Sequence, residues 1–486
     1  MKKYFIIFLA VAVMAAFAIT TDLSAAGAKM IWKGDYQVVG VASDNVHDYD
    51  DDLADEVNHY TQRFRLMSIA ATQYVKGIVG IEIGWDEWGK SYTDHGSNES
   101  PQGEINSQGG GDTGVADDNK PVNIELRFAY IDFAIPGTPV SVSVGKQAIW
   151  THGFFIFSGA LVPPALKITA KLSEEMKFVA WTVKHDEGKA LSSNLRGIGD
   201  HDRDTYCAEF SMTTKAFNLG LYGVYHRDRK QFDSMTYYYL YAATYAATGD
   251  SDAAHAAADA AAVQTFDDDI YWIGLWGGAM AGIAKIDLDF IYAMGSRDYE
   301  SGTGTDYDYA AYLVKLAVST KISGISLMLS TLYTSGDDDS TDDEQNNFPW
   351  IQATTLYPST GHGFPGPNLY QWGNGIAGED FTWTGMWGQG HSEGIWLTNL
   401  TVVAPLIEKT KLVFKYWLMR VVEDPAQDYK DKMIGHEFDL ELHYALSENL
   451  TVSGEVDYLL AGDYLASDDD GADSAWKAAW RVMYKF

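Results

Sequence analysis

Residues 475–486, which read AWKAAWRVMYKF, discriminate between the fold classes open to this chain. One set of alternate positions is apolar or aromatic: Trp476, Ala478, Trp480, Val482, Tyr484 and Phe486. The set between them carries the basic side chains Lys477, Arg481 and Lys485. Successive side chains of a β-strand point to opposite faces. The segment therefore predicts a strand with an apolar medium on one side and a charged, aqueous space on the other.

The composition favours a membrane barrel. The 486 residues include 30 Tyr, 15 Trp and 21 Phe, and membrane barrels place Trp and Tyr in girdles at both interfaces. No stretch beyond the first thirty residues reaches the apolar length of a spanning helix. The single cysteine, Cys207, excludes an internal disulfide framework. A formal net charge of -32 argues against nucleic acid as a partner.

The N-terminus predicts a secretory signal peptide over residues 1–26. Lys2 and Lys3 precede an apolar run, and the small residues of LSAAGAK place the cleavage after Ala26 or Ala28. A retained anchor would need about 20 apolar residues, and the run here is shorter. The mature chain, residues 29–486, is then expected to form one domain.

The same alternation recurs along the chain, most clearly in GHEFDLELHYALSENLTVSGEVDYLLAGD at residues 435–463. Apolar residues alternate there with charged ones on both sides of the turn LSEN. A soluble sandwich would expose the charged face, whereas an outer-membrane barrel would turn it inward. Periodicity does not separate the two folds, so the lengths of the connections must.

Short and long connections alternate strictly, as in a meander with tight turns at one end. The eight short ones are residues 72–74, 134–138, 173–175, 214–216, 280–282, 320–323, 404–409 and 446–449, and nine longer ones lie between them. With a first strand near residues 30–41 this predicts an all-β, transmembrane, antiparallel up-and-down barrel of 18 strands. Merging the pair around Pro163 and Pro164 would give 16. The long loops are expected to be extracellular and the short turns periplasmic, in a bacterial outer membrane.

The C-terminal residue follows from this fold, because the last strand must pair with the first to remove the sheet edge. We expect Phe486 to lie on the lipid face, where it either presents a signal to the outer-membrane assembly machinery or simply anchors the strand at the interface. Membrane lipid and lipopolysaccharide are the expected surroundings.

Charged residues at inward positions of the strands are the predicted pore lining. They are Arg63, Arg65, Arg127, Lys477, Arg481 and Lys485 in one sector, and Asp287, Asp289, Glu437, Asp439, Glu441, Glu455 and Asp457 in others. Placing opposite charges on different sectors of the wall would produce an electric field across the pore. Alternatively, the charges only form cross-strand pairs, such as Glu455 and Asp457 with Lys477 and Arg481. Most of the excess acidity lies in the long connections, so weak ionic selectivity is expected.

Two loop features leave alternatives open. Residues 148–166, AIWTHGFFIFSGALVPPAL, carry no Asp, Glu, Lys or Arg, so this third long connection either narrows the pore or covers a subunit contact.

Acidic runs such as DYDDD, DDDSTDDE and SDDDGADS would offer oxygen ligands to Ca²⁺. None has EF-hand spacing, and solvated loops are favoured. No cofactor and no metal site are predicted.

Several stretches resemble the outer-membrane homotrimeric porin family: GIEIGWDEWG, ELRFAYIDFAIP, AWKAAWRVMYKF and the hairpin that begins GHEFDLELHY. That hairpin and VGKQ are also similar to alginate-export-like barrels. The resemblance implies a homotrimer of water-filled channels for passive diffusion of small hydrophilic solutes and ions. A substrate-specific or polysaccharide-export channel is the alternative, although a polyanion exporter would line its conduit mostly with Arg. No catalytic constellation supports an enzyme, and only the acidic loops support an adhesin.

Overall fold

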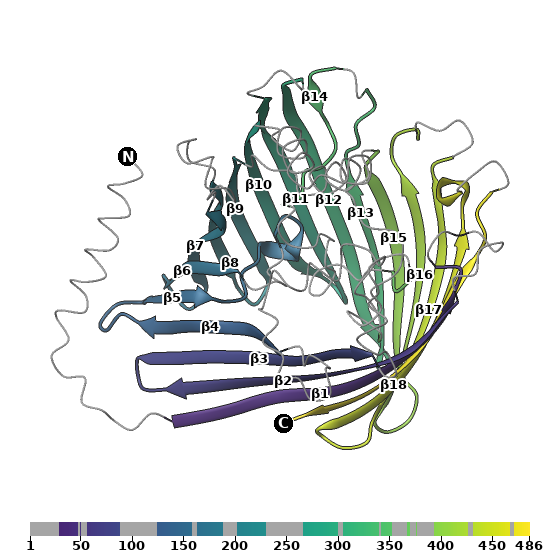
Figure 1. Ribbon diagram of the computed structural model, residues 1–486, viewed down its shortest axis with the longest axis horizontal. Helices are drawn as coiled ribbons and strands as arrows, with labels where there is room; N and C mark the ends of the chain where they lie inside the picture. The colour runs from purple at the N-terminus through teal and green to yellow at the C-terminus, as the bar shows by residue number, and fades with distance from the viewer. Residues whose placement is uncertain are drawn as a thin grey trace, which may run out of the picture.

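The computed structural model describes residues 29–46, 49, 56–87, 124–157, 163–187, 202–229, 266–299, 305–339, 342–351, 367–369, 376, 393–425, 431–466 and 471–486 (Figure 1). The predicted signal peptide lies outside these residues, so its cleavage stays a prediction. No helix within the described ranges is long and apolar enough to cross a membrane.

The described chain is built almost entirely of β-strands. The strands of the first half are β1 (Lys29–Asp44), β2 (Val57–Ala71), β3 (Val75–Glu87), β4 (Ile124–Ala134), β5 (Val140–Lys146), β6 (Pro164–Lys171), β7 (Met176–Glu187), β8 (Asp202–Thr213) and β9 (Phe217–Asp228). Those of the second half are β10 (Phe266–Ala281), β11 (Ala284–Tyr299), β12 (Tyr307–Ile322), β13 (Ile325–Thr334), β14 (Glu344–Gln345), β15 (Ile395–Pro405), β16 (Thr410–Val421), β17 (Met433–Ala445), β18 (Leu450–Ala461) and β19 (Ala475–Lys485). Two short 3₁₀ turns, η2 (His152–Phe154) and η5 (Asp463–Leu465), lie in connections.

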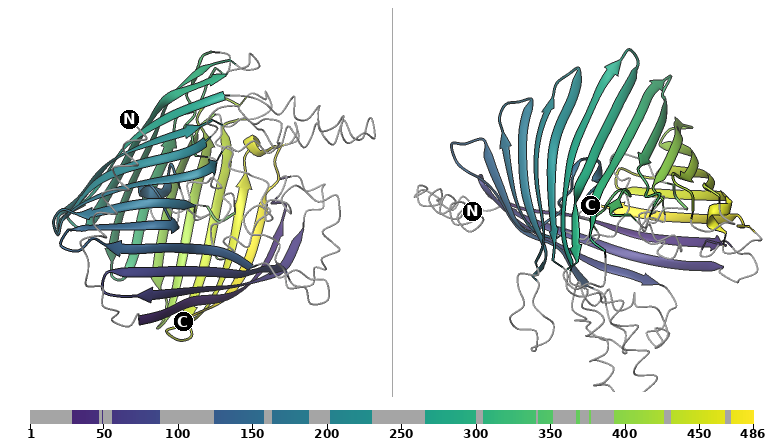
Figure 2. Two further views of the ribbon diagram at one scale, coloured as in Figure 1. Left: turned by 60° about the vertical axis from the view of Figure 1, so that its left-hand side comes forward. Right: turned by 90° about the horizontal axis from the view of Figure 1, so that it is seen from above.

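All strands except β14 form one closed antiparallel barrel of 18 strands (Figures 1 and 2). Each strand pairs with its neighbours along the chain, and β1 also pairs with β19, with Val39 opposite Arg481. The two-residue β14 instead adds in parallel to β12. The prediction of 18 strands is confirmed, and the alternative of 16 is wrong. Both β5 and β6, on either side of Pro163, are fully paired although they are short.

The connections also follow the predicted alternation. Tight turns join β2 to β3, β4 to β5, β6 to β7, β8 to β9, β10 to β11, β12 to β13, β15 to β16 and β17 to β18. All eight meet at one end of the meander because every wall strand runs antiparallel to the next. The long connections, including the one between β13 and β15, therefore leave from the opposite end.

Alternate positions of the strands cover the outer face with apolar side chains. Trp480 of β19 is 40% exposed, and its ring lies over Gly40 of β1, where any side chain would collide with it. The same exposed set on other strands includes Leu275, Phe290, Leu316, Leu400, Leu440 and Val456. An apolar outer surface of this extent fits hydrocarbon surroundings and not water.

Aromatic side chains also form rows around the outer face. The rings of Tyr206 and Tyr271 stack on either side of Tyr225, with centroids 5.9 and 4.8 Å away. Tyr333 stacks on Tyr312 at 5.9 Å in the same manner on β12 and β13. Rows of this kind on adjacent strands are what an interfacial girdle requires.

The C-terminal residue completes the seam between the first and last strands. The main-chain N–H of Phe486 donates to the carbonyl of Gly34 at 3.0 Å, and the N–H of Gly34 donates back to the carbonyl of Phe486 at 3.0 Å. The Phe486 ring is exposed and stacks on Phe64 and Tyr484. The expected position on the outer face is therefore correct, and recognition by the assembly machinery stays a prediction.

Candidate functional site

The inward side chains divide the barrel interior into three sectors. The basic sector lies on β2 to β4, the apolar sector on β7 to β13, and the charged sector on β16 to β19. Each strand contributes alternate residues to its sector, because only every second side chain points inward. The buried apolar core of this protein therefore lies inside the barrel, between the wall and connections that fold inward.

The basic sector centres on one buried carboxylate. Glu82 of β3 accepts hydrogen bonds from Arg65 of β2 and Arg127 of β4. Arg63, one inward position further along β2, lies 3.7 Å from a carboxylate oxygen of Asp35. Arginine forks fit carboxylates well, and a shared carboxylate holds two guanidinium groups at a fixed spacing.

The apolar sector is covered by the third long connection. Phe155 and Phe157 of this connection are fully buried, and the Phe157 ring packs against Trp181 of β7 with centroids 5.4 Å apart. The indole N–H of Trp272 donates to the carbonyl of Pro349 at 3.2 Å, so the start of the connection after β14 reaches the same wall. The described part of residues 148–166 thus narrows the interior, as one of the two alternatives predicted.

His152 ties this connection to inward charges. Its imidazole stacks on Trp276 with centroids 4.0 Å apart, and its Nε2 lies 3.1 Å from a carboxylate oxygen of Asp289. Lys315 of β12 reaches the other oxygen of Asp289 at 3.0 Å. His152 is therefore a fixed link between this connection and the wall.

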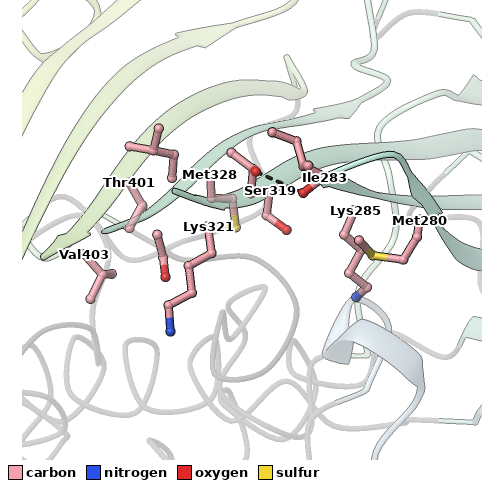
Figure 3. Close-up of a pocket in the computed structure, with 11 residues that line it drawn as sticks. Met280, Ile283, Lys285, Ser319, Lys321, Met328, Thr401 and Val403 are labelled. Carbon is pink, nitrogen blue, oxygen red and sulfur yellow. Dashed lines mark hydrogen bonds between the residues drawn. The ribbon is translucent and has the colours of Figure 1, made fainter. Parts of the chain in front are cut away.

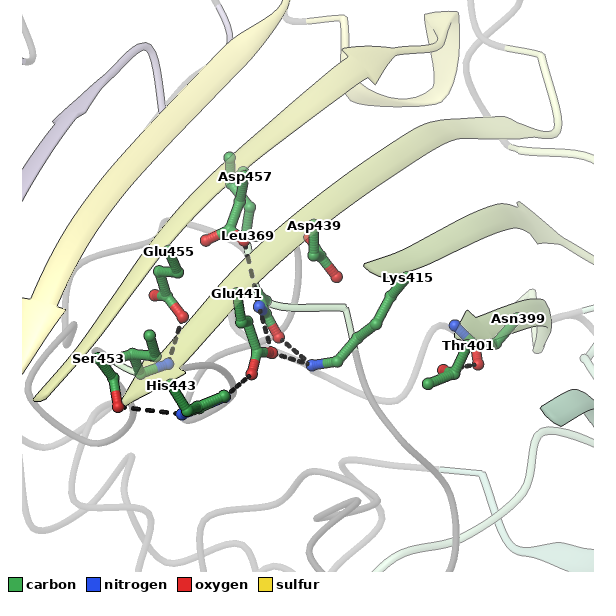
Figure 4. Close-up of polar contacts among 12 residues, drawn as sticks. Leu369, Asn399, Thr401, Lys415, Asp439, Glu441, His443, Ser453, Glu455 and Asp457 are labelled. Atoms are coloured by element: carbon green, nitrogen blue, oxygen red, sulfur yellow. Dashed lines mark hydrogen bonds and ion pairs between the residues drawn. The ribbon is translucent and has the colours of Figure 1, made fainter. Parts of the chain in front are cut away.

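The charged sector concentrates ionisable groups from four neighbouring strands, and Figure 4 shows those of β16, β17 and β18. Lys477 of β19 has no exposed surface and lies 3.2 Å from Glu455 and 3.1 Å from Asp457 of β18. Lys415 of β16 lies 2.7 Å from Glu441 of β17. Each cation is therefore held between carboxylates of the adjacent strands, as in the alternative of cross-strand pairs. Such buried pairs are costly to break, since removal of one partner leaves an uncompensated charge.

The longest connection, between β13 and β15, reaches into this sector. The Asn368 side chain donates to Glu441 and Asp457 at 3.2 and 3.1 Å, and it accepts from Lys415 at 2.7 Å. Further on, the main-chain N–H of Ile376 donates to Glu455. Residues 368, 369 and 376 of this connection thus lie inside the barrel, although its composition suggested an outer, solvated loop.

A hollow of about 440 Å³ opens on the inner face at the short-turn end (Figure 3). Ser319, Met328 and Thr401 line it from β12, β13 and β15. Lys285 stands at its edge and pairs with Asp287 at 2.7 Å. Its lining mixes hydroxyl, thioether and ammonium groups, which suits a vestibule more than a tight binding pocket.

All thirteen residues predicted to line a pore lie at inward positions. The structure brings Lys477, Glu437, Asp439, Glu441, Glu455 and Asp457 together in the charged sector, with Arg481 beside them. Arg63, Arg65 and Arg127 form the basic sector, whereas Asp289 and Asp287 lie apart on β11. Lys485 faces Asp35 near the short-turn end. Most of these groups contact inward connections or one another, so their contact with a water-filled pore stays a prediction.

Four residues of this interior were missing from the sequence prediction: Lys315, Lys415, His152 and Asn368. The two lysines occupy inward positions of regular strands, so the alternation itself could have identified them. His152 and Asn368 lie in connections, where no periodicity indicates which wall they contact.

The possible calcium sites are not tested by the structure. Among the described residues, no group of three His, Cys, Asp or Glu is arranged to hold a metal ion. The run DYDDD apart from Tyr49, and parts of DDDSTDDE and SDDDGADS, lie outside those residues.

A closed barrel of 18 antiparallel strands with an apolar exterior and charged side chains on its inner wall is the architecture of an outer-membrane porin. Solved structures of three Acinetobacter baumannii proteins share it. OccAB3 aligns with a TM-score of 0.52 at 10% identity, covering 94% of this chain and 99% of that chain. OccAB4 and OccAB2 both align with a TM-score of 0.51, at 10% and 11% identity, each covering 94% of this chain and 98% of theirs. No protein-family model and no curated protein matches the sequence. The likeness establishes the fold.

Proposed function

We propose that this protein is a porin of the bacterial outer membrane that lets small hydrophilic solutes and ions diffuse passively across it. The observation that carries the proposal is the closed 18-stranded barrel whose strands are apolar outside and carry two sectors of charged side chains inside. A barrel satisfies every main-chain polar group within hydrocarbon, and its charged interior gives water and solutes a path. The OccAB proteins with the same fold support this assignment.

Single-channel recording tests the proposal directly. Purified protein added to a planar lipid bilayer is expected to produce stepwise increases in conductance that grow with salt concentration. Protein that inserts, as shown by protection of its strands from protease, but conducts no ions would refute the proposal.

The inward connections favour a channel with some selectivity over a wide general pore. Two connections contact the inner wall on different sectors, which leaves less open cross-section than the barrel alone would provide. Five carboxylates in the charged sector, Glu437, Asp439, Glu441, Glu455 and Asp457, are unsuited to a polyanion. Substrate-specific passage is therefore the second candidate, and polysaccharide export is disfavoured.

The proposal includes the protein's surroundings and assembly. Lipid and lipopolysaccharide would cover the apolar outer face, Phe486 would guide insertion, and three copies would assemble, as the resemblance to homotrimeric porins implies. No enzymatic activity, cofactor or metal requirement is proposed, with solvated acidic loops preferred to calcium sites. Light scattering of the detergent-solubilised protein tests the trimer, and a protein mass of one chain would contradict it.

A further inference from the structure

The charged sector binds amide groups of the longest connection through both their N–H and their carbonyl groups. The peptide bond between Asn368 and Leu369 shows this most clearly. Lys477 Nζ donates to the Asn368 carbonyl at 2.6 Å, and the Leu369 N–H donates to Glu437 Oε1 at 2.7 Å. The wall thus supplies a cation to the negative end of the amide dipole and a carboxylate to its positive end.

Ile376 shows a related arrangement on two successive peptide bonds. Its N–H donates to Glu455, and its carbonyl, which belongs to the next peptide bond, accepts from Arg481 Nη1 at 3.3 Å. Glu455 and Arg481 belong to neighbouring strands, so the pair is preformed by the register of β18 and β19.

The side chain of Asn368 is a further amide that this sector binds. Its oxygen accepts from Lys415, whereas its nitrogen donates to Glu441 and Asp457. A primary amide offers one acceptor group and two N–H donors, and all three find a partner of matching kind here. Each of these bonds is charge-assisted, and such bonds are stronger than those between neutral groups.

We propose that this wall cluster, defined as Lys415, Glu437, Glu441, Glu455, Asp457, Lys477 and Arg481, is a binding site for the amide groups of permeating solutes. Short peptides and amide-bearing amino acids are the solute class, and the Asn368–Leu369 and Ile376 segments occupy the site as an internal stand-in. A solute bearing only negative charge would meet carboxylates at the positions where the stand-in places N–H groups. This inference rests on the proposed channel function, because the site lies inside the barrel.

Two solutes that differ only in an amide test the site. Glycylglycine and 5-aminopentanoate carry the same terminal charges at the same spacing, but only the first contains a peptide bond. Titration calorimetry of the detergent-solubilised protein is expected to show saturable binding of glycylglycine and at least about tenfold weaker binding of 5-aminopentanoate, as loss of one charge-assisted pair predicts. Equal binding of the two solutes, or binding of neither, would overturn the inference.

Variants separate a recognition site from a structural cluster. Asn368→Ala removes one amide of the stand-in and is expected to tighten glycylglycine binding by about tenfold, because the competitor is weakened. Lys415→Met, in the cluster, should weaken binding, while Lys285→Met, in the hollow at the short-turn end, should leave it unchanged. If Lys415→Met does not assemble, the comparison of the two solutes on the wild-type protein and the affinity of Asn368→Ala still test the inference. Unchanged or weaker affinity in Asn368→Ala would count against the inference.

Conductance distinguishes this inference from the channel proposal. Channels that conduct but do not discriminate the two solutes in calorimetry would retain the porin assignment and refute the amide site. A protein that discriminates them in calorimetry but never conducts would support the amide site and refute the channel.

Discussion

The apolar and charged sectors of the inner wall are both covered by connections, but by different forces. Phe157 packs on Trp181 in the apolar sector, where burial is non-directional and neighbouring side chains can adjust. Asn368 sits in the charged sector, where each bond requires a particular atom at about 3 Å. The comparison shows that one barrel can hold a connection mainly by apolar packing on one side and mainly by hydrogen bonds between matched polar atoms on the other.

The largest expected effect comes from removing the cation of the charged sector. Lys477→Met leaves Glu455 and Asp457 buried without their shared partner, and the loss of unfolding free energy should be about 3 to 5 kcal/mol. Urea unfolding of the protein refolded into lipid vesicles measures it. Lys285→Met, whose side chain is half exposed, should cost less than about 1 kcal/mol.

Partial rescue would show that the charge, and not the length of the side chain, is responsible. The double variant Lys477→Met with Asp457→Asn should recover part of the lost stability, since one of the two uncompensated carboxylates is removed. If Lys477→Met unfolds at the same urea concentration as the wild type, the buried pairs contribute nothing and the contrast between the sectors is wrong.

The next effect is expected in the apolar sector. Phe157→Ala leaves a cavity between the third long connection and the wall, and the cost should be about 3 to 4 kcal/mol, at the lower end for such substitutions because the connection can relax. Chymotrypsin should then cleave near Trp150 faster than in the wild type, and single-channel conductance should rise. Phe178→Ala, on the outer face of β7, is the matched control and should change neither. An unaltered cleavage rate in Phe157→Ala would mean that the connection is held by other contacts.

Much of the barrel could be predicted from the sequence because strand geometry is visible in it. The alternation of apolar and charged residues along β19 predicted that Lys477 points inward and Trp480 outward. The lengths of the connections predicted the number of strands. The pair β5 and β6 was the weakest point, since Pro163 interrupts an already short segment. The pairing of β5 and β6 depends on contacts between separate segments, which the alternation of residues within one strand does not reveal.

The connections that cover the two sectors differ in how well the sequence predicts where they lie. Residues 148–166 have no charged side chain, so burial against some apolar surface was expected, and only its identity was open. Asn368 meets Glu441 across 73 residues of sequence, within a connection whose composition is acidic and polar. A contact between a loop amide and a wall carboxylate leaves no periodic signal, so only the structure reveals it.

The inside and outside of β19 provide the third test. Trp480→Arg places a charge on the lipid face, which costs about 2 to 4 kcal/mol at the bilayer midplane, and the yield of assembled protein should fall. Trp480→Phe keeps the face apolar and should assemble like the wild type. Heat-modifiable migration on a denaturing gel measures assembly. Normal assembly of Trp480→Arg would show that this face of the strand does not meet hydrocarbon.

The smallest expected effect concerns ionic selectivity, because three lysines of the inner wall are held in close ion pairs. Lys477 with Asp457, Lys415 with Glu441 and Lys315 with Asp289 are close pairs, and a matched pair has little net field beyond its own length. Charge on outer loops is screened within about 8 Å at physiological salt. The reversal potential under a tenfold salt gradient should therefore stay well below the roughly 59 mV of a perfectly selective univalent channel.

Arg481 offers a single inward charge whose reversal should shift the selectivity of the channel. It faces the interior and donates to the Ile376 carbonyl, so Arg481→Glu reverses an inward charge and weakens one contact of the longest connection. Assembly should be retained, since the lipid face of β19 is unchanged, and the reversal potential should move toward cation selectivity by a few millivolts, in keeping with the screening of a single charge. Lys285→Glu reverses one inward charge at the short-turn end and should shift the reversal potential in the same direction. A wild-type channel that is already strongly selective for cations would mean that unmatched carboxylates of the long connections, and not the paired wall charges, control the ions' path.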